Sequence, residues 1–189
     1  MRVPEKNNPS FHRLLSPRFA LFVLAVVAAS LATPALKAQT MQFANEGFVL
    51  SDKEADLEKT ENDYLLNGET ESNWSQKLVL TRFPTAKDAN AFAENLCAAI
   101  NTQRPGTGAT VSRFGADCYI AYSVASSVGT GQLNMVHRIL IDPQGGIRSY
   151  VFAQRPSASK SAANQTPIGR DQCIQALGRL SPMIQLAHN

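Results

Sequence analysis

The chain has 189 residues and a formal net charge of +3; 44% of its residues are hydrophobic, 17% are charged, 11 are Gly and 10 are Pro. This composition excludes a collagen-like chain, a long coiled coil, a polytopic membrane protein and a chain that is disordered throughout. A domain of about 150 residues buries roughly 70% of the surface that its unfolded chain exposes, so its stability requires neither a metal nor a set of disulfides. We therefore expect a globular domain.

Residues 1–38 have the pattern of a secretory signal peptide. Four basic residues precede an apolar run over residues 19–29, and small residues follow it. This run is shorter than the ~20 apolar residues of a transmembrane helix. We expect cleavage after Ala38, with cleavage after Ala35 or an uncleaved anchor as the alternatives. Residues 39–189 are then predicted to form a single domain that is periplasmic or secreted, with no stable membrane insertion after processing.

Removal of residues 1–38 would change the net charge from +3 to −1, because this segment holds five basic residues and one acidic residue. A chain with that charge lacks the strongly basic surface of a nucleic-acid-binding protein, so we expect no nucleic-acid partner. The remaining charge is divided: residues 39–96 carry −6 and residues 97–189 carry +5. Either complementary faces within one domain or separate acidic and basic surfaces for two partners explain this asymmetry.

The first half of the predicted domain contains short segments with strand character. Residues 39–45 have little periodicity and are predicted to be a loose arm, whereas residues 52–61 fit either a helical turn or an exposed sheet edge. The Asn67-Gly68 pair is typical of a turn. The predicted strands are apolar or alternating runs over residues 48–50, 58–66 and 74–83.

A helix is predicted to follow Pro84 and to run to about Thr102. Thr85 is expected to cap its first turn, and Asp88, three residues later, to supply the reciprocal carboxylate. Apolar residues recur at steps of three and four along this helix and form one stripe: Ala89, Phe92, Ala93, Leu96, Cys97 and Ile100.

The second half has more regular strand patterns and ends in a second amphipathic helix. The predicted strands cover residues 109–114, 118–125, 133–141 and 147–153; a flexible loop covers residues 155–167 and the helix residues 168–180. Runs of hairpins that are interrupted by two helices indicate the α+β class. We expect an antiparallel sheet of about six or seven strands with two amphipathic helices packed on it.

Three cysteines lie in the predicted mature chain, and export would place them in an oxidising compartment. Cys97 is predicted on the apolar side of its helix, and Cys118 on a strand face that also carries Ile120. We therefore expect a Cys97–Cys118 disulfide where the helix packs on the sheet, worth about 3 kcal/mol in the chain-entropy estimate. A pair that uses Cys173, or three buried thiols without a bridge, are the alternatives.

Few residues have the pattern of a catalytic site. A thiol enzyme needs a thiolate beside a histidine, so an envelope enzyme that uses Cys173 or His137 is the rival interpretation. The chain contains no C-x-x-C, H-E-x-x-H, G-x-S-x-G or Walker pattern. The cysteines and His137 also lack the local spacing of zinc ligands. We expect no metal and no cofactor.

The stretch Gly68–Trp74 is a polar turn that leads into a strand and contains the chain's only Trp. Trp74 either closes the end of the core or anchors a ligand or partner in a groove, and we take it as the candidate binding residue. Residues 64–100 resemble small uncharacterised exported bacterial proteins in which a Gly-Glu turn, a Trp and a strand precede an Ala-rich helix. The resemblance implies no activity and supplies no site residue.

These observations favour an exported small binding or accessory protein of the cell envelope over an enzyme. Its partner would be a protein or a small molecule of that compartment. A small envelope enzyme and a secreted inhibitor or effector are the alternatives.

Overall fold

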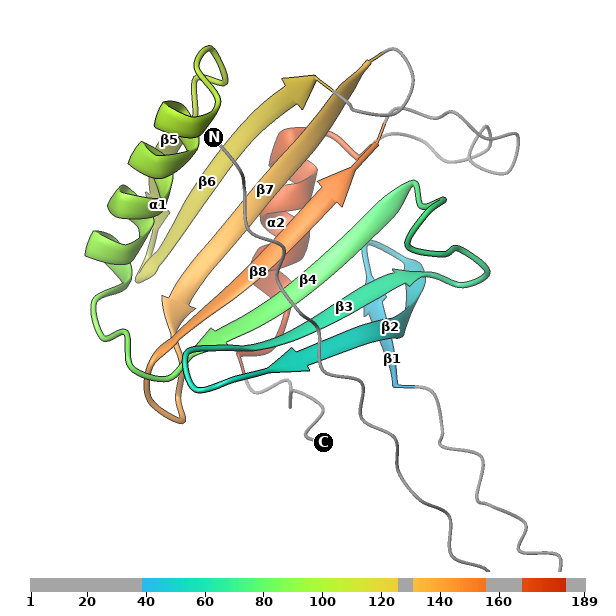
Figure 1. Ribbon diagram of the computed structural model, residues 1–189, viewed down its shortest axis with the longest axis horizontal. Helices are drawn as coiled ribbons and strands as arrows, with labels where there is room; N and C mark the ends of the chain where they lie inside the picture. The colour runs from blue at the N-terminus through green and yellow to red at the C-terminus, as the bar shows by residue number, and fades with distance from the viewer. Residues whose placement is uncertain (1–38, 126–130, 156–167, 183–189) are drawn as a thin grey trace, which may run out of the picture. The chain divides into compact units, whose positions relative to one another are not determined.

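An antiparallel sheet of eight strands is the central element of the structure (Figure 1). The computed structural model describes residues 39–125, 131–155 and 168–182. These residues all belong to one compact unit, Lys37–Asn189. The strands are β1 (Thr40–Phe43), β2 (Glu46–Ala55), β3 (Thr60–Leu66), β4 (Gln76–Phe83), β5 (Thr110–Phe114), β6 (Asp117–Ala125), β7 (Gln132–Ile141) and β8 (Ile147–Gln154). The helices are α1 (Ala89–Gln103) and α2 (Arg170–Arg179), so the predicted α+β class is confirmed.

The strand order, β1-β2-β3-β4-β8-β7-β6-β5, places two four-stranded meanders side by side. Strands β4 and β8 join the meanders at the centre, with pairing from Gln76↔Gln154 to Phe83↔Ile147. Helix α1 follows β4 and precedes β5, so it connects a central strand of the sheet to the strand at one edge. Every pair of neighbouring strands is antiparallel.

The two helices pack on opposite faces of the sheet, and Figure 1 shows α2 behind β7 and β8. On β6, Cys118 and Ile120 belong to the core cluster under α1, whereas Tyr119 and Ala121 belong to the cluster under α2. Successive side chains of a strand point to opposite faces, so the sheet separates two apolar cores. We call these two sides the α1 face and the α2 face.

A buried group of charges joins the β7–β8 turn to β4. Asp142 is 2% exposed, and its Oδ2 accepts a hydrogen bond from Arg148 Nε at 2.9 Å. The same oxygen forms ion pairs with Arg148 Nη2 at 2.8 Å and Arg82 Nε at 3.2 Å. Gly146 in the same turn has a φ of +95°, and a Cβ there would lie 2.4 Å from the carbonyl oxygen of Phe83. Only glycine fits this approach, which aligns the two meanders.

The structure contains more strands than the expected six or seven. Residues 39–45 were predicted to be a loose arm, but residues 40–43 form the edge strand β1. Met41 and Phe43 are 8% and 2% exposed and pack in the core under α2, so burial of alternate side chains stabilises this short strand. Strand β2 also extends through its polar half, where residues 52–55 are exposed and pair with β3.

The predicted N-cap of α1 was wrong. The helix begins at Ala89, and Asp88 is the N-cap: its Oδ1 accepts hydrogen bonds from the backbone amides of Asn90 at 2.9 Å and Ala91 at 3.0 Å. Asp88 has the extended backbone that an N-cap requires, with φ −115° and ψ 103°. Thr85 lies three residues before this cap, in the turn that follows β4.

Two other expectations concern residues that the structure does not describe. The predicted signal peptide, residues 1–38, lies outside the described residues, as does the predicted flexible loop apart from Arg155. In the described ranges, neither α1 nor α2 combines the length and the hydropathy that a bilayer-spanning helix needs.

We predict that Asp88→Ala lowers the free energy of unfolding by about 1 kcal/mol, because it removes the acceptor of two first-turn amides. The matched variant Thr85→Ala should change it by less than about 0.5 kcal/mol. Denaturant titrations of both variants provide the measurement. A larger loss in Thr85→Ala than in Asp88→Ala would contradict the observed cap.

Candidate binding site

A cavity of about 480 Å³ lies between the N-terminus of α2 and the ends of β6, β7 and β8, and we call it the α2 cavity. Its apolar wall includes Ala121, Val136 and Phe152 from the three strands and Cys173 from α2. The volume falls in the range of about 300 to 1,000 Å³ that is typical of small-molecule sites. The sheet, the helix and the loop that holds Thr107 and Gly108 thus line an open-sided space large enough for an organic ligand.

Arg138 positions the helix that covers this cavity. The residue is 6% exposed, and its Nη1 donates to the carbonyl oxygens of Leu177 at 2.8 Å and Leu180 at 2.7 Å. Its Nε donates to Asp117 Oδ2 at 2.7 Å. The last carbonyls of a helix lack intrahelical partners, and a positive charge there is favourable. Arg138 therefore anchors the C-terminal end of α2 to β7.

A row of polar side chains crosses the sheet at the opposite end of α2. Ser123 pairs with Asn134, and Asn134 pairs with Gln154, so these residues lie side by side on β6, β7 and β8. They lie two residues beyond Ala121, Val136 and Phe152 and therefore point to the same α2 face. All three polar residues line the α2 cavity.

Gln154 is the most unusual member of this row. It is 7% exposed, and no hydrogen bond joins its carboxamide to another side chain or backbone group of the described residues. Ser123 Oγ donates to Asn134 Oδ1 at 2.7 Å, which leaves the Asn134 amide nitrogen as a donor beside Gln154. No carboxamide atom of Gln154 is among the fully buried, unpaired side-chain atoms of the described residues, so its polar end opens onto the α2 cavity.

The N-terminus of α2 presents free backbone amides beside the cavity. Its N-cap is Gly169, which has no side chain to accept a hydrogen bond from the first turn. Gln172 Oε1 accepts from the Gly169 amide at 3.3 Å, and the Cys173 amide donates to the Gly169 carbonyl at 2.9 Å. The amides of residues 170–172 have no acceptor within the helix, and the helix dipole adds partial positive charge there.

The charge around the cavity has one sign. Arg170 is the single charged residue of its described lining, which contains no Asp or Glu. A second cavity of about 410 Å³ is lined by Arg104 and shares Thr107 and Ser123 with the first. The basic half of the sequence thus contributes both charged residues that line this pair of cavities.

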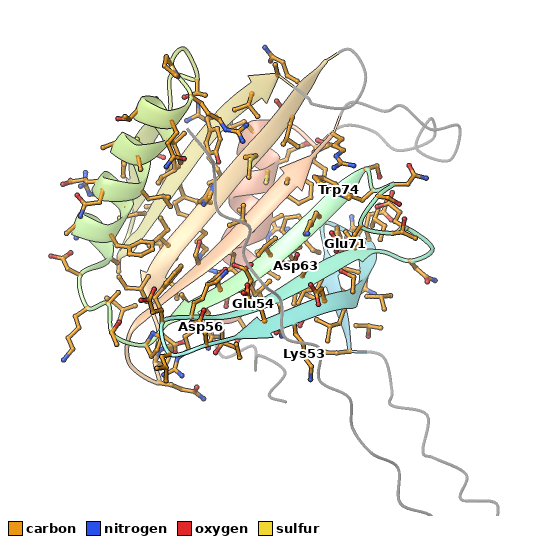
Figure 2. The ribbon with its side chains drawn as sticks, in the orientation of Figure 1. Lys53, Glu54, Asp56, Asp63, Glu71 and Trp74 are labelled. Atoms are coloured by element: carbon orange, nitrogen blue, oxygen red, sulfur yellow. The ribbon has the colours of Figure 1, made fainter. Side chains whose placement is uncertain are left out.

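Most acidic side chains of residues 39–96 lie in β2 and β3 and in the turns that flank these strands. Figure 2 labels four of them, Glu54, Asp56, Asp63 and Glu71. Lys77 forms ion pairs with Asp63 and, at 2.9 Å, with Glu71. Burial raises the pKa of Asp63, although the ion pair with Lys77 opposes this shift. These contacts favour the explanation in which charges on neighbouring strands balance each other within the domain.

Trp74 lies outside the α2 cavity. The residue is half-buried before the start of β4, and Figure 2 shows it beside the beginning of that strand. The guanidinium carbon of Arg155 lies 3.7 Å from the centroid of its ring, and the Arg155 amide donates to the carbonyl of Ser75 at 2.9 Å. One face of the indole is therefore occupied by a cation–π contact.

The predicted Cys97–Cys118 bridge is not formed, and the cysteines Cys97, Cys118 and Cys173 are free thiols. Cys97 Sγ lies 3.3 Å from the carbonyl oxygen of Ala109, whereas Cys118 pairs with Arg113. Ala109 precedes Arg113 by four residues, about 13 Å of extended strand. A disulfide needs Cα atoms within about 7 Å. The two residues share one core cluster, but Cys97 lies in the middle of α1, whereas Cys118 Sγ lies 3.2 Å from Asn90 Oδ1 in the first turn of that helix.

The alternative catalytic pair is divided by the sheet. Cys173 packs on the α2 face, and burial raises its pKa to about 12, so the thiol is protonated at neutral pH. His137 follows Val136 on β7, and Val136 points to the α2 face, so His137 points to the α1 face. There its Nε2 lies 3.3 Å from the hydroxyl oxygen of Tyr122. Burial lowers the pKa of His137 to about 4. The pair makes no thiolate–imidazole site.

None of the residues that the cavity brings together was predicted as a binding residue from the sequence, apart from the alternative catalytic residue Cys173. Asn134 could have been found, because strand alternation places it on the same face as Val136. Gln154 lies at a strand end and Gly169 at a helix start, with the predicted loop between them. Their proximity depends on how Arg138 fixes α2, and no local pattern encodes it.

Comparisons with family models, curated proteins and solved structures found no match for this chain. Within the described residues, no group of three or more His, Cys, Asp or Glu side chains is arranged to hold a metal ion.

We predict three alkylated cysteines when the protein is unfolded in denaturant without a reductant and treated with iodoacetamide. In the folded protein Cys173 should be alkylated slowest, because it is 1% exposed and its pKa is about 12. Peptide mapping by mass spectrometry identifies the labelled residues. A label on Cys173 alone would instead support the Cys97–Cys118 bridge that the sequence favoured.

Proposed function

We propose that this protein is an exported binding module of the cell envelope and that the α2 cavity is its ligand site. The observation that carries this proposal is a cavity of about 480 Å³ with Gln154, 7% exposed, in its wall. The body of the Gln154 side chain is packed in the wall, whereas its carboxamide opens onto the cavity and can bond to a ligand. A ligand that occupies the cavity and bonds to Gln154 accounts for both features.

The mixture of apolar and polar residues that line the α2 cavity also supports a small molecule as the partner. Ligand sites in proteins are mostly apolar and contain a few polar groups that fix the orientation of the ligand. Val136 and Phe152 provide the apolar part of the α2 cavity, and Asn134 and Gln154 provide polar groups on one side. Export to the periplasm or the exterior rests on the pattern of residues 1–38.

The alternatives have less support in the described residues. An envelope enzyme that uses Cys173 or His137 would need the two to meet or one to be activated, but they lie on opposite faces and both are in the uncharged form at neutral pH. A secreted inhibitor or effector would need an exposed anchor, and Arg155 covers one face of Trp74. Neither alternative explains the cavity.

We predict that 8-anilinonaphthalene-1-sulfonate binds the folded protein with a saturable increase in fluorescence and that Ser123→Leu weakens this binding about tenfold, because the larger side chain fills part of the cavity. Ser112→Leu is the matched control, since Ser112 is a half-buried serine on β5 that does not line the cavity. Circular dichroism verifies that both variants are folded. Equal binding by Ser123→Leu and Ser112→Leu would refute the cavity as the ligand site.

A further inference from the structure

We infer that the ligand of the α2 cavity is a small amphiphilic anion, whose carboxylate or similar acidic group lies at the N-terminus of α2 and whose apolar part lies on Val136 and Phe152. This inference rests on the proposed function, because it concerns the chemistry of the same site. It is carried by the groups that line the cavity and by their hydrogen-bonding state.

The polar groups of the cavity include several hydrogen-bond donors. The carboxamides of Gln154 and Asn134 lie on the α2 face of neighbouring strands and each carries N–H donors, and Asn134 Oδ1 accepts a hydrogen bond from the Ser123 hydroxyl. Gln154 is 7% exposed and its carboxamide opens onto the cavity, where a ligand would displace water from it. An acidic group on the ligand would accept from both nitrogens.

The helix provides a second, independent set of donors. The amides of residues 170–172 belong to the first turn of a ten-residue helix whose N-cap, Gly169, has no side-chain acceptor. Backbone amides at a helix N-terminus bind anions, and the helix dipole favours negative charge there. Asp171 lies in this turn, but it is exposed and does not line the cavity.

The charge and the apolar surface complete the description of the ligand. Arg170 is the one charged residue of the described lining, and no carboxylate is present there to repel an anion. Burial keeps Cys173 protonated, so its thiol adds no negative charge. Ala121, Val136 and Phe152 form a continuous apolar surface on three neighbouring strands, which fits a short alkyl chain or an aromatic ring.

Three probes with the same alkyl chain separate the charge requirement from the apolar requirement: octanoate, 1-octanol and octylamine, which is a cation at pH 7. Isothermal titration calorimetry of the purified protein at low ionic strength should show octanoate binding at least about tenfold tighter than 1-octanol, and octylamine binding weakest. Raising the salt concentration should weaken octanoate binding and leave 1-octanol binding nearly unchanged.

Two substitutions at one position test the role of Gln154. Gln154→Leu should weaken octanoate about tenfold and leave 1-octanol within about threefold of the original protein, because it removes donors and keeps the volume. Gln154→Glu should abolish octanoate binding and strengthen octylamine binding.

Arg170→Gln should weaken octanoate binding several-fold, whereas Arg179→Gln, at the other end of α2, is the matched control and should have no effect. Thermal unfolding verifies that each variant is folded.

The outcomes distinguish the two claims. If 1-octanol or octylamine binds as tightly as octanoate, or if Gln154→Leu and Gln154→Glu leave octanoate binding unchanged, the anionic class of ligand is overturned. Such results leave the cavity in place as a binding site, provided that Ser123→Leu still weakens the probes. If Ser123→Leu weakens none of them, the binding lies elsewhere and the proposed function fails as well.

Discussion

The contact between Arg138 and the C-terminal carbonyls of α2 is the interaction on which the site depends. The buried guanidinium of Arg138 donates hydrogen bonds to the carbonyl oxygens of Leu177 and Leu180 at the helix end. It also forms an ion pair with Asp117 and lies 5.7 Å from the ring centroid of Tyr150. Removing one partner of a buried ion pair typically costs about 3–5 kcal/mol. This contact therefore holds the C-terminal end of α2 on β7, and the position of that end determines where the N-terminal end lies.

The dimensions of the two elements explain why the other end of α2 reaches the polar row. A helix of ten residues is about 15 Å long. Asn134 precedes Arg138 by four residues on β7, which corresponds to about 13 Å of strand. An α2 that is anchored at Arg138 and runs along β7 therefore begins near Asn134. The cavity, its free amides and the buried Gln154 follow from this match.

Local patterns predicted much of the fold and little of the site. The alternation in residues 76–83 and the stripe that includes Ala93 and Cys97 correspond to β4 and α1, because burial of one face produces a regular period. Strand β1 was missed because only two of its side chains are buried. The face on which each helix packs, and hence the separation of Cys173 from His137, depends on long-range topology that periodicity does not report.

Hydrogen exchange measured by NMR on Arg138→Met tests most directly whether Arg138 holds α2 over the cavity. We predict that the amides of α2, between Cys173 and Leu180, exchange at least about tenfold faster than in the original protein, because the helix opens locally more often without its anchor. Amides of α1, between Ala93 and Ile100, should keep their protection, since α1 packs on the other face of the sheet. Unchanged protection of α2, or an equal loss in both helices, would contradict the account.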